Sequence, residues 1–183
     1  IDYAHDSGFY LGAWGSNVDF GDCCDENVEI DVYTGFRGGD AVTWDVGLVY
    51  YTYPGADDID FPEIYVGLGW EWLSGKVTYS NDFGNSDESA FYYEANASYE
   101  LPSNFGVNAH VGYSDGDAID LAYEDSYMDW SVGVTYDWSN FTFGLKYADG
   151  SDLSLLDGTP DDVNSSEGVA IFSISTSFPW SKE

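Results

Sequence analysis

Basic residues are the scarcest class in this sequence. Lys and Arg together number 4, against 34 Asp and Glu residues, and the formal net charge is -30 at pH 7. A surface of this charge repels phosphate groups, which argues against nucleic acid as a partner. The same charge is compatible with divalent cations, with cationic ligands, or with a salty habitat that screens the self-repulsion.

Long apolar runs are also missing. The sequence has no uninterrupted stretch of about 18 apolar residues, the length from which a transmembrane helix is inferred, so it predicts no membrane-spanning helix. No secretory signal peptide stands at Ile1. A mature or trimmed chain would also lack one, so its absence does not indicate a cytoplasmic protein.

Cysteine is limited to the adjacent pair Cys23 and Cys24. Two neighbouring cysteines cannot provide a disulfide framework for a fold. A strained bond between the two, a bond to another chain and a pair of free thiols are all open alternatives. A metal site at this pair would need further ligands, which the sequence does not identify.

Glycine and aromatic residues are abundant. The chain holds 21 Gly, 16 Tyr, 11 Phe and 7 Trp residues, a composition typical of all-β proteins. Its length of 183 residues predicts one domain over residues 1–183, with enough apolar residues for a core or a membrane face.

The stretch 129–150 shows the pattern of the whole chain most clearly. In its first arm, 129–138, aromatic and aliphatic residues alternate with Asp, Ser, Gly and Thr, a period of two that predicts a strand. After the link Ser139 and Asn140, the alternation continues over 141–147 and predicts a hairpin. Aromatic residues stand at both ends of the apolar face with aliphatic residues between them, as in a lipid-facing β-hairpin.

Alternating segments of this kind recur about eleven times along the chain. They are expected at 1–5, 9–17, 28–36, 41–53, 63–72, 76–81, 89–101, 105–113, 129–138, 141–147 and 168–178. Short links of about three residues alternate with long links of about seven to twenty, as periplasmic turns and external loops do in outer-membrane barrels. The long links hold 21 of the 34 carboxylates and no Lys or Arg, and they lie at 19–27, 55–62, 82–88, 114–125 and 149–167.

These regularities predict an antiparallel up-and-down transmembrane β-barrel in a bacterial outer membrane, with its long acidic loops outside the cell. A soluble sandwich or barrel is the alternative. Nothing in such a fold requires the long, acidic loops to lie together at one end of the strands. A closed bacterial barrel normally has an even number of strands with both termini at the periplasmic end. We therefore expect a strand before Ile1 and about twelve strands in the complete barrel.

Several segments resemble the TorF-type family of porins. They are DSGFYLGAWGSNVDF (6–20), EIDVYTGF (29–36), WDVGLVYYTYPG (44–55), EIYVGLGW (63–70), YEANASYELP (93–102) and DWSVGVTYDW (129–138). The resemblance covers nearly the whole chain and is most specific in its first third. It implies an outer-membrane pore of Gram-negative bacteria, and in that family the pattern is preceded by a further strand.

The polar faces of the predicted strands give the candidate pore-lining residues. They are Glu29, Asp31, Asp45, Glu63, Glu71, Lys76, Glu94, Glu100, His110, Asp129, Asp137 and Lys146. Such a lumen should attract cations and small cationic or neutral solutes, and reject anions. The alternative is a small barrel in which these side chains pack as a closed polar core. The candidate aromatic belts comprise Trp44, Trp70, Trp72, Trp130, Trp138, Phe141 and Tyr147.

Catalysis finds little support in the sequence. Neither His5 nor His110 has an identifiable nucleophile near it, so we expect a protein that is not an enzyme and requires no cofactor. Calcium is more plausible, because Asp115, Asp117 and Asp120 offer oxygen ligands in one loop, although their spacing is not that of an EF-hand. Solvated acidic loops are the simpler interpretation.

A passive pore in contact with outer-membrane lipid is therefore the first functional hypothesis. The second is a structural or adhesive β-protein that self-associates. Its copies would be joined by calcium, by the Cys23–Cys24 loop or by an open strand edge. Homo-oligomers are compatible with both hypotheses.

Overall fold

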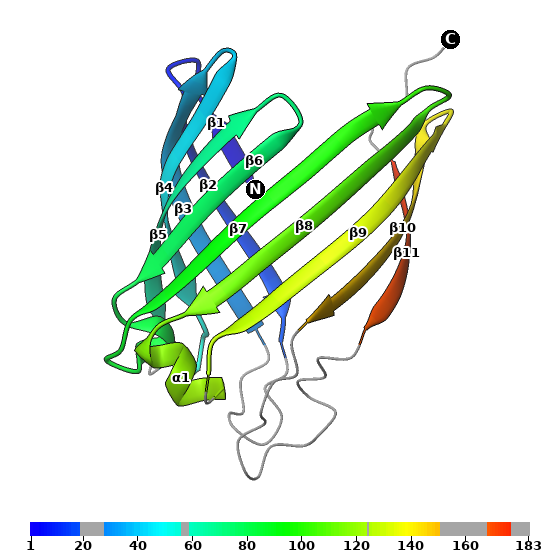
Figure 1. Cartoon of the computed structure of the whole chain (residues 1–183). Coiled ribbons are helices and arrows are strands. Elements are labelled where there is room, and N and C mark those ends of the chain that lie inside the picture. Colours follow the sequence, from blue (N-terminus) through cyan, green and yellow to red (C-terminus); the bar gives the residue numbers. More distant parts are fainter. Residues whose placement is uncertain (19–27, 56–58, 124, 151–167, 177–183) are drawn as a thin grey trace.

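A computed structural model describes residues 1–18, 28–55, 59–123, 125–150 and 168–176 of the chain. Within these residues, eleven strands form one antiparallel sheet in which each strand pairs with its neighbours in sequence, from β1 to β11 (Figure 1). The all-β class, the antiparallel up-and-down order and the strand number are as the sequence predicted.

The strand bounds follow the alternating segments closely. They are Asp2–Ala4 (β1), Phe9–Asn17 (β2), Val28–Gly39 (β3), Val42–Thr52 (β4), Phe61–Trp70 (β5), Leu73–Ser80 (β6), Ala90–Leu101 (β7), Phe105–Asp115 (β8), Tyr127–Trp138 (β9), Phe141–Gly150 (β10) and Val169–Thr176 (β11). A 3-10 helix, Phe83–Asn85 (η3), and an α-helix, Asp117–Tyr123 (α1), lie in two of the long connections.

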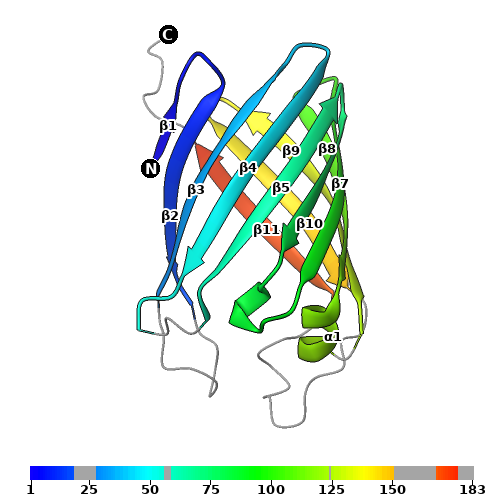
Figure 2. The same cartoon turned by 90° about the vertical axis from the view of Figure 1, so that its left-hand side faces the viewer.

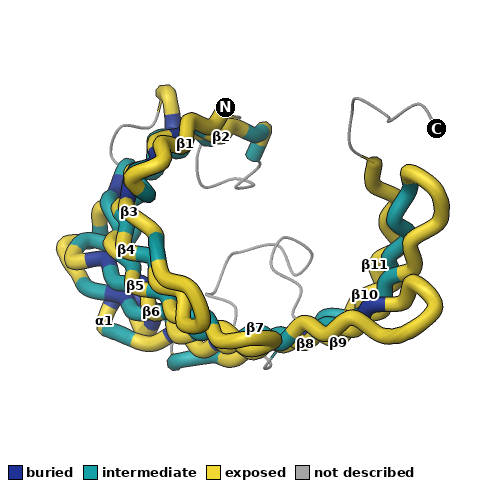
Figure 3. The backbone as a smooth tube through the Cα atoms, turned by 90° about the horizontal axis from the view of Figure 1, so that it is seen from above, coloured by how far each residue is buried: buried dark blue, intermediate teal, exposed yellow. Residues whose placement is uncertain are grey.

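The sheet curls strongly about an axis that runs roughly along the strands. Short connections such as those between β3 and β4 or β7 and β8 lie at one end, while α1 and the connection between β6 and β7 lie at the other (Figures 1 and 2). Seen from above, the backbone forms an incomplete ring, with β1 and β2 along one edge and β10 and β11 along the other (Figure 3). One face of the sheet is therefore convex and outer, and the other concave and inner.

The outer face is largely apolar. Val46, Val66 and Val77 are direct neighbours on β4, β5 and β6 and are 47%, 53% and 42% exposed. Because side chains alternate between the two faces of a strand, the polar residues between them lie on the inner face. The molecule thus carries apolar side chains outside and polar side chains inside, the reverse of a water-soluble globular protein.

Apart from Tyr10 of β2, the buried apolar residues of the described part of the chain lie at the end of the sheet that carries α1. Tyr53 and Phe61 pack together there, and Ala118 and Ile119 of α1 pack against Ala90 at the start of β7. Ala90 lies opposite Ser80 on the inner face, in the same alternation as Lys76 and Glu94. The contacts with Ala90 therefore hold α1 over part of the inner face at this end of the sheet. No helix of the described residues is long and apolar enough to span a membrane.

Three strand ends beside the short turns differ from the sequence-based prediction. The strand expected at 63–72 ends at Trp70, and Glu71 forms the following turn with a left-handed φ of 52°. Conversely, Arg37 was expected in a turn, but β3 continues through it and pairs it with Asp45. Gly75, expected to form a turn, lies inside β6 opposite Leu68.

Candidate functional site

The inner face of the sheet gathers nearly all the predicted pore-lining residues. Glu71 is the exception, because it lies in the exposed turn between β5 and β6. The inner face carries the other predicted residues, Glu29, Asp31, Asp45, Glu63, Lys76, Glu94, Glu100, His110, Asp129, Asp137 and Lys146. It also carries Arg37, whose place on the face follows from the alternation that runs from Glu29 through Tyr33 and Gly35.

One cross-strand row links five of these charged residues. Successive pairings from β3 to β10 join Arg37, Asp45, Gly67, Lys76, Glu94, Gly112, Asp129 and Gly150. Basic and acidic side chains alternate along the first part of this row, separated in places by glycines that contribute no side chain. The inner wall is therefore a line of opposite charges with gaps, rather than a uniformly acidic surface.

Tyrosines lie flat over glycines of the neighbouring strand on this face. Three direct cross-strand pairs show the arrangement: Tyr33 with Gly12, Tyr10 with Gly35 and Tyr65 with Gly47. A Cβ atom on any of these glycines would overlap the ring or hydroxyl of its tyrosine. Covering a strand glycine with an aromatic ring is a known way of stabilising a curved sheet. Here it also keeps the rings against the wall and out of the interior.

Gly47 and Gly67 provide a matched test of this packing. We expect Gly47→Ala to lower the free energy of unfolding by about 1–3 kcal/mol, as overpacking does, because its Cβ would displace Tyr65. At Gly67 the nearest neighbours of an added Cβ are the Gly75 carbonyl oxygen at 3.7 Å and the Asp45 Cβ at 3.9 Å, ordinary contact distances. Gly67→Ala should therefore cost nothing measurable. Denaturant titration of both variants in lipid vesicles checks this, and equal stabilities would contradict it.

Tyr10 and Tyr65 contact the charged side chains in the first part of this row. The Tyr10 hydroxyl donates to Asp45 Oδ1 at 2.6 Å and hydrogen-bonds the Tyr65 hydroxyl. Arg37 Cζ lies 5.4 Å from the centre of the Tyr10 ring, and Lys76 Nζ lies 5.6 Å from that of Tyr65, both within range of a cation–π contact. Lys76 also forms an ion pair with Glu94 at 3.1 Å.

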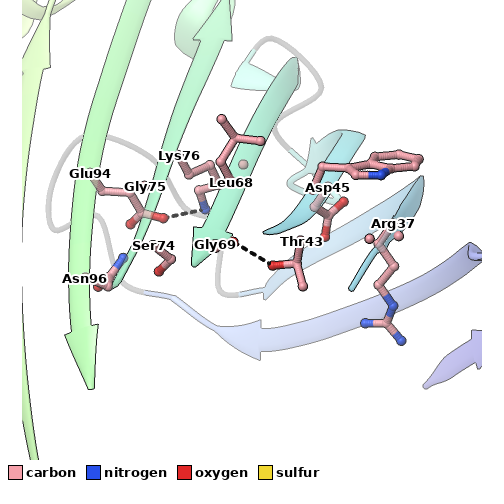
Figure 4. A pocket seen from close by; sticks show the side chains of 14 residues that line it. Arg37, Thr43, Asp45, Leu68, Gly69, Ser74, Gly75, Lys76, Glu94 and Asn96 are labelled. Atoms are coloured by element: carbon pink, nitrogen blue, oxygen red, sulfur yellow. Dashed lines mark hydrogen bonds and ion pairs between the residues drawn. The ribbon is translucent and has the colours of Figure 1, made fainter. Parts of the chain in front are cut away.

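Arg37, Asp45, Lys76 and Glu94 line a pocket in the inner wall of about 450 Å³. In Figure 4, Arg37 and Asp45 lie at one end of the pocket and Lys76 and Glu94 at the other. Between them, Gly67 and Gly69 of β5 leave the wall without side chains, and the Thr43 hydroxyl donates to the Gly69 carbonyl at 3.4 Å. The pocket is thus lined by groups of both charges and small polar groups.

A second polar network is centred on His110. Its Nδ1 hydrogen-bonds Asn96 Oδ1 at 2.7 Å, and its Nε2 hydrogen-bonds Asp129 Oδ1 at 2.9 Å. The Tyr92 hydroxyl donates to Asp129 Oδ2 at 3.0 Å. Both ring nitrogens of His110 are occupied by these contacts, which favours a role in holding β7, β8 and β9 together rather than in catalysis.

Carboxylates concentrate on the inner face toward the long connections. The Tyr51 hydroxyl donates to Glu63 Oε2 at 2.9 Å, and Asp31 lies directly across from Trp14 of β2. Asp31 Oδ1 is buried without a hydrogen-bond partner among the described residues. Tyr53 lies just beyond β4. Burial, and to a smaller extent the negative charge of the nearby Glu29, raises the pKa of Tyr53 to about 12, so this phenol stays neutral.

The predicted aromatic belt residues separate into two levels. Trp44, Trp70, Trp138 and Phe141 lie on the outer face toward the short turns, and Trp72 lies in the turn itself. Trp130 and Tyr147 lie on the outer face toward the long connections, with ring centres 5.7 Å apart.

The candidate calcium ligands do not converge. Asp115 ends β8, whereas Asp117 and Asp120 lie in the first turn of α1, where carboxylates interact favourably with the helix dipole. The described part of the chain contains no group of three or more His, Cys, Asp or Glu side chains suited to a metal ion. Cys23 and Cys24 lie outside the described residues, and calcium binding elsewhere in the acidic loops stays a prediction.

Comparisons with known proteins agree with the fold. Residues 1–178 match the family described as "Bacterial protein of unknown function (Gcw_chp)". No curated protein matches the chain. A porin structure refined at 1.8 Å matches 97% of this chain with a TM-score of 0.53 and 17% identity, and the chain spans only 60% of that porin. The NanC porin matches with a TM-score of 0.62 and 14% identity over 97% of both chains.

Proposed function

This chain belongs to the Gcw_chp family, and we propose that it forms a porin-like channel in a bacterial outer membrane, through which small solutes diffuse passively. The observation that carries the proposal is the sidedness of the sheet. Its outer face exposes apolar side chains bounded by aromatic residues, as lipid contact requires, and its inner face is polar. The two porin neighbours and the sequence resemblance to TorF-type porins support the same function.

An open interior is favoured over a packed polar core. Tyr10, Tyr33 and Tyr65 lie against the wall over glycines, and cavities of about 450 and 570 Å³ line the inner face. Among the described residues, no large side chain is fully buried. A closed polar core would bury such side chains and fill these spaces.

The charge of the inner face favours cations. Its basic residues are Arg37, Lys76 and Lys146, and the more numerous carboxylates belong to Glu29, Asp31, Asp45, Glu63, Glu94, Glu100, Asp129 and Asp137. A lumen with this excess of carboxylates raises the local concentration of cations and lowers that of anions. We place the long acidic loops on the extracellular side, where they would add to the same preference.

Planar bilayer recordings test the channel. In a KCl gradient, the purified chain should give discrete conductance steps, and the reversal potential should show K⁺ permeating several times faster than Cl⁻. Heat-denatured protein is the control. Bilayers that stay sealed would contradict the channel, and assemblies that dissociate when calcium is removed would then favour the structural alternative.

A further inference from the structure

Arg37 and Asp45 are neighbours on the inner wall but are not an ion pair. They are direct cross-strand partners on β3 and β4, a relation in which opposite charges normally interact. Among the described residues, neither side chain has an oppositely charged group within the 4.0 Å that defines an ion pair. In a chain with so few basic residues, an arginine left unpaired beside a carboxylate requires an explanation.

Tyr10 supplies the explanation, because it holds the two charges separately. The Arg37 guanidinium lies over the face of its ring, 5.4 Å from the ring centre. The hydroxyl at the other end of that ring donates to Asp45 Oδ1 at 2.6 Å. Tyr10 itself is 9% exposed and is fixed against Gly35 of β3. The positive and negative groups are thus positioned before any solute arrives.

The space beside these two charges has the size of a small metabolite. The pocket of about 450 Å³ extends from them over the bare backbone of Gly67 and Gly69 to Lys76, and it opens to the inner face (Figure 4). Lys76 is already neutralised by Glu94 at 3.1 Å. The uncompensated charges in the pocket are therefore one guanidinium and one carboxylate.

We propose that Arg37 and Asp45, held apart by Tyr10, bind a small zwitterionic solute of the α-amino-acid type on the lumen wall. The carboxylate of the solute contacts the Arg37 guanidinium, and its ammonium group contacts Asp45. A simple cation is repelled by Arg37 and a simple anion by Asp45, whereas a zwitterion satisfies both groups. This inference rests on the proposed channel and adds a solute class to it.

Uptake of labelled L-alanine into proteoliposomes tests the site, with lactamide as a neutral probe of similar size. Alanine uptake through the wild-type protein should saturate, and lactamide uptake should rise linearly with concentration. Removing one charge-assisted contact by Arg37→Gln should raise the half-saturating concentration of alanine about tenfold. Asp45→Asn provides a second variant, with the same expected shift, should R37Q fail to assemble.

Lys146→Gln controls for charge, because it removes an equal charge from the inner face of β10, away from the pocket. A shift in half-saturation with R37Q or D45N and not with K146Q supports the site. Equal shifts in R37Q and K146Q would overturn the proposed site, and so would wild-type alanine uptake that never saturates. If the same vesicles still conduct KCl, either result leaves the channel proposal standing. Loss of conductance in the wild type would instead refute the channel itself.

Discussion

Arginine in place of Val66 is expected to lower the free energy of unfolding in lipid vesicles by about 2–4 kcal/mol, the cost of that charge at the middle of a bilayer. Val66 lies near the middle of β5 on the outer face, between Val46 and Val77 of the adjacent strands. The guanidinium cannot reach water from this depth without distorting the surrounding lipid. Reversible urea unfolding in phospholipid vesicles, followed by tryptophan fluorescence, measures the loss.

Val42 gives a matched control for this substitution. It is the first residue of β4, beside the short turn, and its side chain is 53% exposed, the same fraction as that of Val66. Val42→Arg lies at the membrane interface and should cost only about 0–1 kcal/mol. If the outer face were in contact with water, equal exposure would make the two substitutions equally tolerable. Equal losses of stability would therefore contradict the membrane-facing assignment.

The sidedness of the sheet could be predicted from the sequence because it depends on a local pattern. Each strand alternates its residues between the outer and the inner face of the sheet, so its own sequence has a period of two. Val46, Val66 and Val77 are assigned to one face without any knowledge of how their strands pair. The same reasoning places Asp45 and Lys76 on the opposite face, where the structure has them.

Strand ends were less predictable, because turn residues are ambiguous signals. Gly38 and Gly39 suggested that β3 ends before Arg37, and Gly75 suggested a turn, yet all three glycines lie within strands. The actual turn after β5 uses Glu71 in a left-handed conformation, which non-glycine residues adopt infrequently. As a result, Arg37 was missed as an inner residue and Glu71 was wrongly placed on the inner face.

The contacts within the site needed the register between strands. Tyr10 is separated from Asp45 by 35 residues in the sequence and from Tyr65 by 55. Alternation gives the face on which each side chain lies, but not its height along the sheet, and the height decides which side chains meet. The pairing of Tyr10 with Gly35 and of Gly47 with Tyr65 sets those heights.

The helix α1 shows a further limit of the alternation argument. The stretch 114–125 was expected to be a loop because it is acidic and follows a strand. Ala118 and Ile119 are each only 3% exposed and pack against Ala90, so tertiary contact stabilises a helix too short to persist alone. Acidic residues in its first turn were the one local signal for a helix start.

Neutralising Asp31, Asp45 and Glu94 together is expected to lower the ratio of K⁺ to Cl⁻ permeability by about tenfold, because acidic lumens concentrate cations to that degree. The three carboxylates lie on the inner faces of β3, β4 and β7. Replacing Glu94 by Gln also frees the positive charge of Lys76, whose ion pair at 3.1 Å is lost. Reversal potentials in 0.1 M KCl, across a salt gradient, measure the change.

Asp87, Glu88 and Asp120 serve as the control, because changing them to amides removes the same net charge from exposed positions in the long connections. Those positions face bulk electrolyte, where charges are screened beyond about 10 Å at 0.1 M salt, so the permeability ratio should change much less. The effect of the lumen variant should also shrink at 1 M KCl, where the screening length is about 3 Å. Equal effects of the two triple variants would mean that the long connections, and not the lumen, determine selectivity. An unchanged permeability ratio in the lumen variant would show that the inner carboxylates do not contact the ion path.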